Sequence, residues 1–230
     1  MIKLRIVGVS GSPRHGNTDI MVKKALEAAK KIESEDVEVE TVFVSLAGKN
    51  IKGCTNCRAC IKAGHCVLKD DWEETFRPLF DPMPDGVILG SPVYFFSVTS
   101  QMRAFLERTT SLLKANFNFA GATRPAPDWS HTVGAALSIG YDRNGGQEHA
   151  IECMNSWFIV NDFLVTGAKH IGYIGAPGWQ CGTAEKDSVL NDELGLRSCE
   201  IIGERVSGAA LIIKRGLMAE EASDKGREVN

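Results

Sequence analysis

The chain has 230 residues, 43% of them hydrophobic, which is enough to bury the core of one α/β domain but would leave two domains small. The formal net charge is −3, and no run of lysine or arginine is dense enough to predict a nucleic-acid or anionic-membrane partner. No apolar stretch reaches the roughly 18 residues that cross a membrane, and no apolar leader precedes the first strand, so we expect a soluble cytoplasmic protein.

The first expected elements are a strand over residues 4–9, where apolar residues run continuously, and a helix from Asp19 onward, where they recur with helical spacing. The loop between them combines glycines with donor side chains, namely Ser10, Ser12, Arg14, Asn17 and Thr18. Unpaired N–H groups and the positive end of the helix dipole attract an anion at such a junction. The loop therefore predicts a phosphate cradle, with an ordinary strand-turn-helix capped by Asn17 or Thr18 as the alternative.

The spacing of the glycines in the cradle limits which phosphate ligands are expected. It does not match the dinucleotide fingerprint Gly-x-Gly-x-x-Gly, and no Gly-Lys-Ser/Thr follows for a nucleoside triphosphate. A terminal monophosphate is therefore the expected ligand group.

Further along the chain, we expect strands over residues 37–44, 86–92 and 132–139, and a fifth strand within residues 164–174. We expect helices over residues 72–80 with Asp71 as the cap, over 98–113, through 151–160 and over 200–217. We expect long loops over residues 46–71 and 114–131, and a turn at Pro177-Gly178-Trp179.

This alternation of strands and helices predicts a doubly wound, five-stranded parallel sheet with helices on both faces. We expect one domain over residues 1–217, with residues 46–71 as a cysteine-rich insertion and residues 218–230 as a loose polar tail. Ligands of such sheets bind at the carboxyl ends of the strands, where residues 10–18, 92–97 and 140–148 are expected to meet.

Two of these loops have the composition to hold a flat polar ring. Pro92, Val93, Tyr94, Phe95 and Phe96 offer aromatic faces and main-chain hydrogen bonds, although an aromatic plug over the next helix is the alternative. The second loop contains Gly145, Gly146 and Gln147, in which the glycines allow close approach and Gln147 can reach a ring carbonyl or start the next helix.

Three segments together resemble the NADPH-dependent FMN reductase superfamily, which has a flavodoxin-like fold. They are residues 11–18, 90–95 and 144–148, and the similarity extends over about residues 3–175. With the cysteines, the chain resembles the iron-sulfur flavoprotein branch in particular. The resemblance implies FMN, with its phosphate on the donors of the 10–18 loop, its isoalloxazine against residues 92–96 and residues 145–147 nearby.

Four of the seven cysteines lie within thirteen residues, at Cys54, Cys57, Cys60 and Cys66. Steps of three residues suit a structural zinc site poorly, and the last gap of five differs from the bacterial ferredoxin run. By resemblance to the iron-sulfur flavoproteins we assign these cysteines to a 4Fe-4S cluster. Zinc and unmetallated thiols remain the alternatives.

Other candidates have simpler explanations. His65 fits a solvated loop histidine, and the pair Asp70-Asp71 fits helix capping better than acid–base chemistry. Cys153, Cys181 and Cys199 have no partner at a metal-site spacing and are expected to be incidental thiols.

The expected function is a redox flavoprotein that transfers electrons between FMN and the 4Fe-4S cluster, an oxidoreductase that needs no catalytic acid or base. The alternatives are a cluster-free NAD(P)H-dependent flavin or quinone reductase, and an FMN-binding electron carrier with a zinc-stabilised loop. NAD(P)H or ferredoxin is the expected donor. By resemblance we expect a homodimer or homotetramer in which the cluster of one chain serves the flavin of its neighbour.

Overall fold

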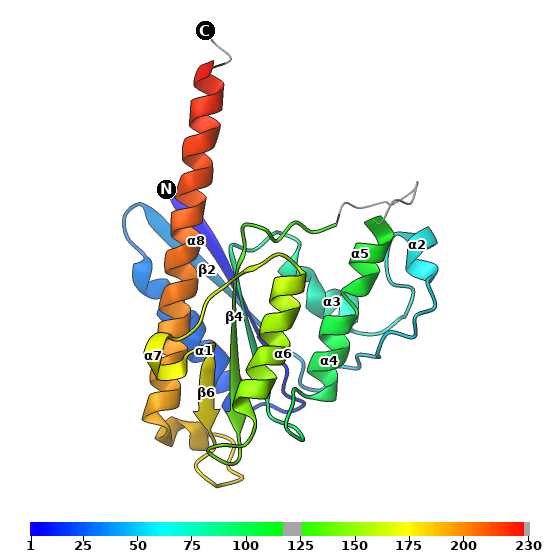
Figure 1. The fold of residues 1–230 in the computed structure, drawn as a ribbon, viewed down its shortest axis with the longest axis vertical. Coiled ribbons are helices and arrows are strands. Elements are labelled where there is room, and N and C mark those ends of the chain that lie inside the picture. Colours follow the sequence, from blue (N-terminus) through cyan, green and yellow to red (C-terminus); the bar gives the residue numbers. More distant parts are fainter. Residues whose placement is uncertain (117–125, 228–230) are drawn as a thin grey trace.

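The computed structural model of the chain describes residues 1–116 and 126–227. Within these residues the strands form one parallel sheet in the order β2-β1-β3-β4-β5, and β6 pairs with a later part of β4 (Figure 1). The strands are β1 (Ile2–Ser10), β2 (Val37–Ser45), β3 (Gly86–Pro92), β4 (Val133–Gly140), β5 (Leu164–Val165) and β6 (Ala176–Trp179).

Helices connect the strands and cover both faces of the sheet. The α-helices are α1 (Asn17–Ala29), α2 (Ala59–Ala63), α3 (Trp72–Phe76), α4 (Ser100–Glu107), α5 (Thr110–Asn116), α6 (Gln147–Val160), α7 (Lys169–Gly172) and α8 (Glu193–Arg227). Short 3-10 helices cover Lys30–Ile32, Arg77–Leu79 and Ser188–Asn191. In the described part of the chain, no helix combines the length and the apolar character needed to span a bilayer.

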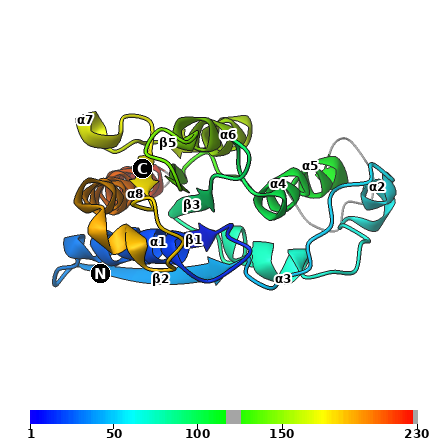
Figure 2. The same cartoon turned by 90° about the horizontal axis from the view of Figure 1, so that it is seen from below.

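The alternation of side chains along the strands divides the core into two layers. In β1, Leu4 and Ile6 pack toward α1 and α8, whereas Val7 and Val9 pack toward α3, α4 and α6. Figure 2 shows these two groups of helices on opposite sides of the sheet. Because both faces are covered, β3, β4 and the second half of β1 are buried almost throughout, and the predicted doubly wound sheet is confirmed.

Strand order reverses at β1. The chain passes from β1 to β2 on one side and then returns to β3 on the other side. Ser10 pairs with Gly90 at the carboxyl ends of these strands, and the Gly11 N–H continues the pairing by donating to the Gly90 carbonyl at 2.7 Å. The loops that follow β1 and β3 therefore leave the sheet side by side, at the position where doubly wound sheets bind ligands.

Several predicted boundaries were wrong. The segment 177–179, predicted as a turn, belongs to β6, which pairs with β4 from Leu137 to Gly140. The segment 164–174 contains only the two-residue β5 and the short α7 among its regular elements. The helix expected over 98–113 is divided into α4 and α5.

The final helix is longer than predicted. It starts at Glu193 and continues through Arg227, so the segment expected to be loose after residue 217 is helical as far as Arg227. In Figure 1 its last turns extend well beyond the sheet. Of the predicted 114–131 loop, residues 114–116 belong to α5 and residues 117–125 lie outside the described residues.

Candidate cofactor sites

The predicted phosphate cradle begins where β1 ends and closes at the first turn of α1. Gly16 is the N-cap residue, and within the described residues no side chain caps this helix. The first-turn N–H groups of α1 are therefore left for another acceptor, which is the condition for anion binding at a helix of this length.

The cradle and the loop after β3 share one pocket. Of the predicted flavin ligands, Ser12, Arg14, Asn17, Thr18, Pro92, Val93 and Tyr94 line this pocket, together with Gly16, Ile139, Tyr141, Gln180 and Ala184. The structure thus brings together the residues predicted to bind a phosphate with those predicted to contact a ring. Ser10, Phe95, Phe96, Gly145, Gly146 and Gln147 lie outside its lining.

Three of the predicted phosphate donors, Ser10, Ser12 and Asn17, already have partners through their side chains, and the Ser12 hydroxyl donates to the Arg14 carbonyl at 2.5 Å. The buried Ser10 hydroxyl donates to Asp19 Oδ1 at 2.5 Å, and the other Asp19 oxygen contacts His15 Nδ1 at 2.7 Å. Asn17 Nδ2 donates to the carbonyl of Glu185 at 2.9 Å, and Asn17 Oδ1 accepts from the Val189 N–H at 3.1 Å. Asn17 therefore fastens the segment after β6 to the start of α1.

The loops after β3 and β4 contact each other outside the pocket. A Cβ added at Gly146, where φ is +102°, would lie 2.7 Å from a ring atom of Phe96. The Phe96 ring also lies 4.7 Å from the His149 ring, measured between centroids. Phe95 and Phe96 both have positive φ, at 49° and 70°, and the Phe95 side chain is fully exposed. Strained, exposed aromatic residues beside a pocket are typical of a ligand or partner contact.

Gln147 lies inside the 140–148 loop. It is 1% exposed, its Nε2 donates to the carbonyls of Asp142 at 2.8 Å and Gly178 at 3.1 Å, and its Oε1 accepts from the Gly145 N–H at 2.8 Å. Its side chain therefore shapes the loop and joins it to β6.

Sequence reasoning missed one wall of the pocket. Gln180 and Ala184 follow β6, and no motif marks them. Tyr141 also lines the pocket, and its hydroxyl donates to the Gly182 carbonyl at 2.9 Å. The position of Tyr141 directly after β4 is the signal that could have identified it.

The four clustered cysteines line a second pocket. Its lining includes Cys54, Cys57, Cys60 and Cys66, and Arg108 and Lys114 from the α4–α5 region contribute to it. The short α2 carries Cys60 and ends at Gly64, whose φ of +71° turns the chain toward Cys66. The insertion predicted from the loss of periodicity is thus a loop around one pocket.

The four thiols do not converge on a single point in this structure. Over residues 1–116 and 126–227, no three His, Cys, Asp or Glu side chains are close enough together to hold one. The N–H of Ala59, and then the Thr55 hydroxyl, lower the pKa of the Cys57 thiol, whereas burial raises the pKa of Cys60. Four thiols in the lining of one pocket are the type of donor that an iron-sulfur cluster requires.

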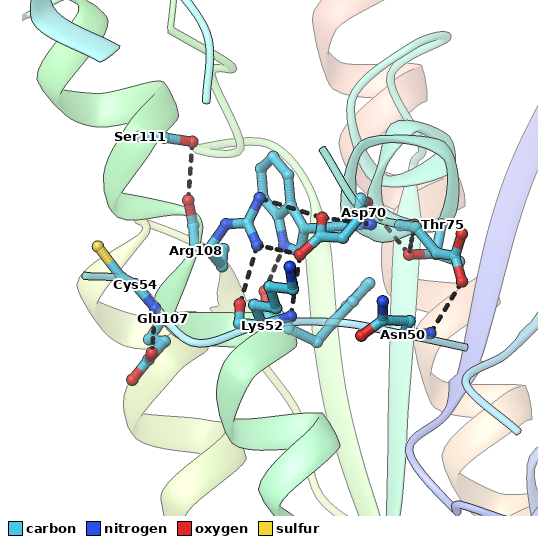
Figure 3. Close-up of polar contacts among 11 residues, drawn as sticks. Asn50, Lys52, Cys54, Asp70, Thr75, Glu107, Arg108 and Ser111 are labelled. Atoms are coloured by element: carbon cyan, nitrogen blue, oxygen red, sulfur yellow. Dashed lines mark hydrogen bonds and ion pairs between the residues drawn. The ribbon is translucent and has the colours of Figure 1, made fainter. Parts of the chain in front are cut away.

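A buried ion pair holds both ends of the cysteine loop, residues 46–71. Arg108 Nη1 donates to Asp70 Oδ2 at 2.8 Å and to the Lys52 carbonyl at 2.8 Å, and both charged side chains are at most 1% exposed (Figure 3). The guanidinium also lies 5.0 Å from the Trp72 ring centroid. Burial opposes the charge on Asp70, but the hydrogen bonds from Arg108, Lys52 and Trp72 outweigh it and lower the pKa of this carboxyl.

The prediction that Asp70 and Asp71 cap a helix was partly wrong. Asp71 is the N-cap residue of α3, but its side chain does not cap the helix, and its Oδ2 accepts from the Asn50 N–H at 2.8 Å. Asp70 Oδ1 does accept from the Trp72 N–H at 3.2 Å, and Asp70 Oδ2 accepts from the Lys52 N–H at 2.9 Å. Both carboxylates therefore join the two arms of the cysteine loop, and Figure 3 shows Asp70 between Lys52 and Arg108.

The fold is flavodoxin-like. RosB, solved with bound 8-demethyl-8-formylriboflavin-5'-phosphate, matches 99% of this chain and 88% of its own with a TM-score of 0.62 at 17% identity. A WrbA-like flavodoxin from Agrobacterium tumefaciens matches 90% of this chain and 97% of its own with a TM-score of 0.55 at 15% identity.

The family follows from the sequence. The profile of the NADPH-dependent FMN reductase family matches residues 4–172, so the chain belongs to that family and is a flavin-dependent oxidoreductase. An iron-sulfur flavoprotein of Methanocaldococcus jannaschii is 34% identical over 217 residues, which cover 92% of this chain and 100% of the relative. An iron-sulfur flavoprotein of Methanosarcina thermophila is 34% identical over 203 residues, 86% of this chain and 95% of the relative.

Proposed function

We propose that this chain binds FMN in the pocket between the cradle and the loop after β3, binds a 4Fe-4S cluster through Cys54, Cys57, Cys60 and Cys66, and transfers electrons between them. The shared pocket of the phosphate-type and ring-type residues supports the flavin position. The shared pocket of the four cysteines supports the cluster position. The names of the relatives support the combination.

In this proposal the phosphate lies over the start of α1. The N–H groups of the first turn would donate to its oxygens, Thr18 lies in the buried lining, and the exposed Arg14 would close the outer side. Ser12 accepts from the Arg14 N–H at 3.2 Å, which holds the loop in its turn. Ser10, Ser12 and Asn17 contribute through their positions, because their side chains are bonded within the protein.

The ring would lie against Pro92, Val93 and Tyr94, with Phe95 and Phe96 at the outer edge and residues 145–147 behind them. FMN supplies exchange of either one or two electrons, and an iron-sulfur cluster exchanges one. The protein residues bind, orient and shield these groups. NAD(P)H or ferredoxin is the proposed donor, and a homodimer or homotetramer is the proposed assembly, in which the exposed residues 94–96 contact a neighbouring chain.

One observation carries the proposal: α4 joins the two pockets. At its start, the Thr99 hydroxyl donates to the Gly11 carbonyl of the cradle at 2.6 Å. At its end, Glu107 accepts from the Cys54 N–H at 2.6 Å. Eight residues of α-helix span about 12 Å. One rigid element therefore sets the separation of the proposed flavin and cluster sites within one chain.

Anaerobic purification followed by an absorbance spectrum and assays of flavin, iron, zinc and sulfide tests the proposal. We expect FMN together with four irons and four sulfides per chain, as the proposed cluster requires. Cys57→Ala should lose iron and keep flavin, whereas Cys153→Ala, outside the cysteine pocket, should keep both. Zinc as the only metal, or undiminished NADPH oxidation by Cys57→Ala, would favour one of the two alternatives given by the sequence.

The flavin half has its own test. Fluorescence titration of the apoprotein should show FMN binding at least about tenfold tighter than riboflavin, because only FMN has the phosphate. Equal affinities for FMN and riboflavin would contradict phosphate binding in the cradle. The metal assays would still test the proposed cluster in the cysteine pocket.

A further inference from the structure

Arg108 lies at the junction of α4 and α5, in contact with the cysteine loop where the loop starts and where it ends. It binds the Lys52 carbonyl on the entering arm and the Asp70 carboxylate on the leaving arm. The preceding residue, Glu107, binds the Cys54 N–H between those arms. Two adjacent residues of one helix end thus determine the path of a loop that otherwise has little regular structure.

The Nε–H group of Arg108 is an unused donor. It is buried, and in the described part of the chain it has no hydrogen-bond partner, whereas both terminal nitrogens have partners. A buried donor without a partner costs free energy, so such groups are normally paired in a complete structure. Arg108 lines the cysteine pocket, where a sulfur acceptor of a bound cluster would supply that partner.

The guanidinium also places a positive charge beside a thiolate ligand. Arg108 and Cys66 line the same pocket. Because Arg108 is 1% exposed, water screens its charge weakly. Lys114 lines the same pocket but is only half-buried and donates to Asn56 Oδ1 at 2.9 Å. Arg108 is therefore the less screened of these two positive charges.

We propose that Arg108 is a positioning residue for the cysteine loop and that its charge raises the reduction potential of the metal centre held there; the second half rests on the proposed function. Its fork fixes both arms of the loop before any metal binds. Its positive charge then stabilises the additional negative charge that one-electron reduction brings to the thiolate-held centre, with no bond formed or broken. Arg108→Lys keeps the positive charge but loses the fork, and Arg108→Gln loses both, so the two variants separate the two roles.

The first experiment uses the metal-free chain. Trypsin cleavage within residues 46–71, at sites such as Lys49, Arg58 and Lys62, reports opening of the loop. Arg108→Gln and Arg108→Lys should both be cleaved at least about tenfold faster than the natural chain, because neither side chain can bind both arms. Arg103→Gln is the matched control, since Arg103 lies on the same helix and is exposed. The Arg103→Gln chain should be cleaved at the same rate as the unmodified chain.

The second experiment measures the midpoint potential of the anaerobically reconstituted centre. Arg108→Gln should shift it to more negative values, and Arg108→Lys should stay nearer the natural value, whereas a purely structural role would shift both equally. If Arg108→Gln does not fold, Arg108→Lys still tests both roles. Its midpoint potential should stay near that of the unmodified chain, and its cleavage rate within the cysteine loop should rise.

The outcomes separate the inference from the proposed function. Unchanged cleavage of both arginine variants overturns the positioning role, whatever the metal content. A potential that is the same in the natural chain and in Arg108→Gln overturns the electrostatic role. A natural chain that takes up no iron overturns the proposed function and the electrostatic role together, while the cleavage rates still decide the positioning role.

Discussion

The two ends of α4 adjoin sites that are built in different ways. At its start, the main chain positions the cradle, through the pairing of β1 with β3 and the hydrogen bond from Gly11 to Gly90. At its end, side chains position the cysteine loop, through Arg108, Asp70 and Glu107. A main-chain site should tolerate the loss of side chains and be sensitive to added volume, whereas a site held by a buried ion pair should show the opposite behaviour.

The largest expected effect is at the ion pair. Asp70→Leu removes one partner and leaves the buried Arg108 charge alone, so we expect the free energy of unfolding to fall by about 3–5 kcal/mol. The double variant Asp70→Leu/Arg108→Met should lose much less than the sum of the single variants, because no charge is left buried. Urea denaturation of the metal-free chains measures both, and strictly additive losses would contradict the coupling.

A smaller effect is expected from added volume in the cradle. A Cβ at Gly11 would lie 2.8 Å from the Met102 Cβ in α4 and 3.2 Å from the Gly90 carbonyl oxygen. Gly11→Ala should therefore lower the free energy of unfolding by about 1–3 kcal/mol and weaken FMN binding about tenfold. Gly208→Ala is the control, since nothing lies within 4 Å of its added Cβ and it is helical, so it should be neutral or stabilising. Equal behaviour of the two variants would show that the cradle is not tightly packed.

Asn17→Ala tests a contact of the cradle that depends on a side chain. It removes the hydrogen bonds to the Glu185 carbonyl and the Val189 N–H, so we expect a loss of about 1 kcal/mol in unfolding free energy. Trypsin cleavage after Lys186 should become faster, because this segment loses its attachment to α1. Native-state proteolysis measures the rate of cleavage after Lys186. An unchanged rate would mean that other contacts hold the segment after β6.

The smallest effect concerns a contact away from both sites. The hydrogen bond from Arg197, followed by that from Lys24, lowers the pKa of Glu200. A lowered pKa in the folded state means that the stabilisation is present above the unfolded pKa of about 4.3 and is lost as pH falls through the folded value. Glu200→Gln should thus lower the free energy of unfolding by about 0.2–1 kcal/mol at pH 7 and by nothing well below pH 4. A difference that grows on acidification would contradict this sign.

Sequence patterns predicted the elements that are organised locally. The apolar runs of β1, β3 and β4 and the helical spacing of α1 and α6 identified the sheet and its ligand edge. They failed at β6, because Pro177 and Gly178 are local turn signals, whereas the strand there forms by pairing with β4, some forty residues earlier in the chain. They also placed α8 too short, since its polar last turns lack an apolar stripe.

The candidate sites follow the same division. The cradle loop and the cysteine spacing are contiguous in the sequence and could be recognised there. The contacts that hold the cysteine loop could not be recognised from the sequence, because Arg108 lies 38 residues from Asp70 and 56 from Lys52. In the sequence, Arg108 is an ordinary polar residue at a helix end. The pocket wall at Gln180 and Ala184 depends on how the chain returns after β6, which no motif encodes.

The closure of the cysteine loop at its base makes that segment a removable unit. Because Arg108, Asp70 and the Lys52 backbone join its two arms, residues 53–69 begin and end at nearly the same place. Exchanging them for a short connector would leave the sheet and the cradle intact. Evolution could therefore graft or excise a thiol-bearing module at this point of the fold without rebuilding the rest.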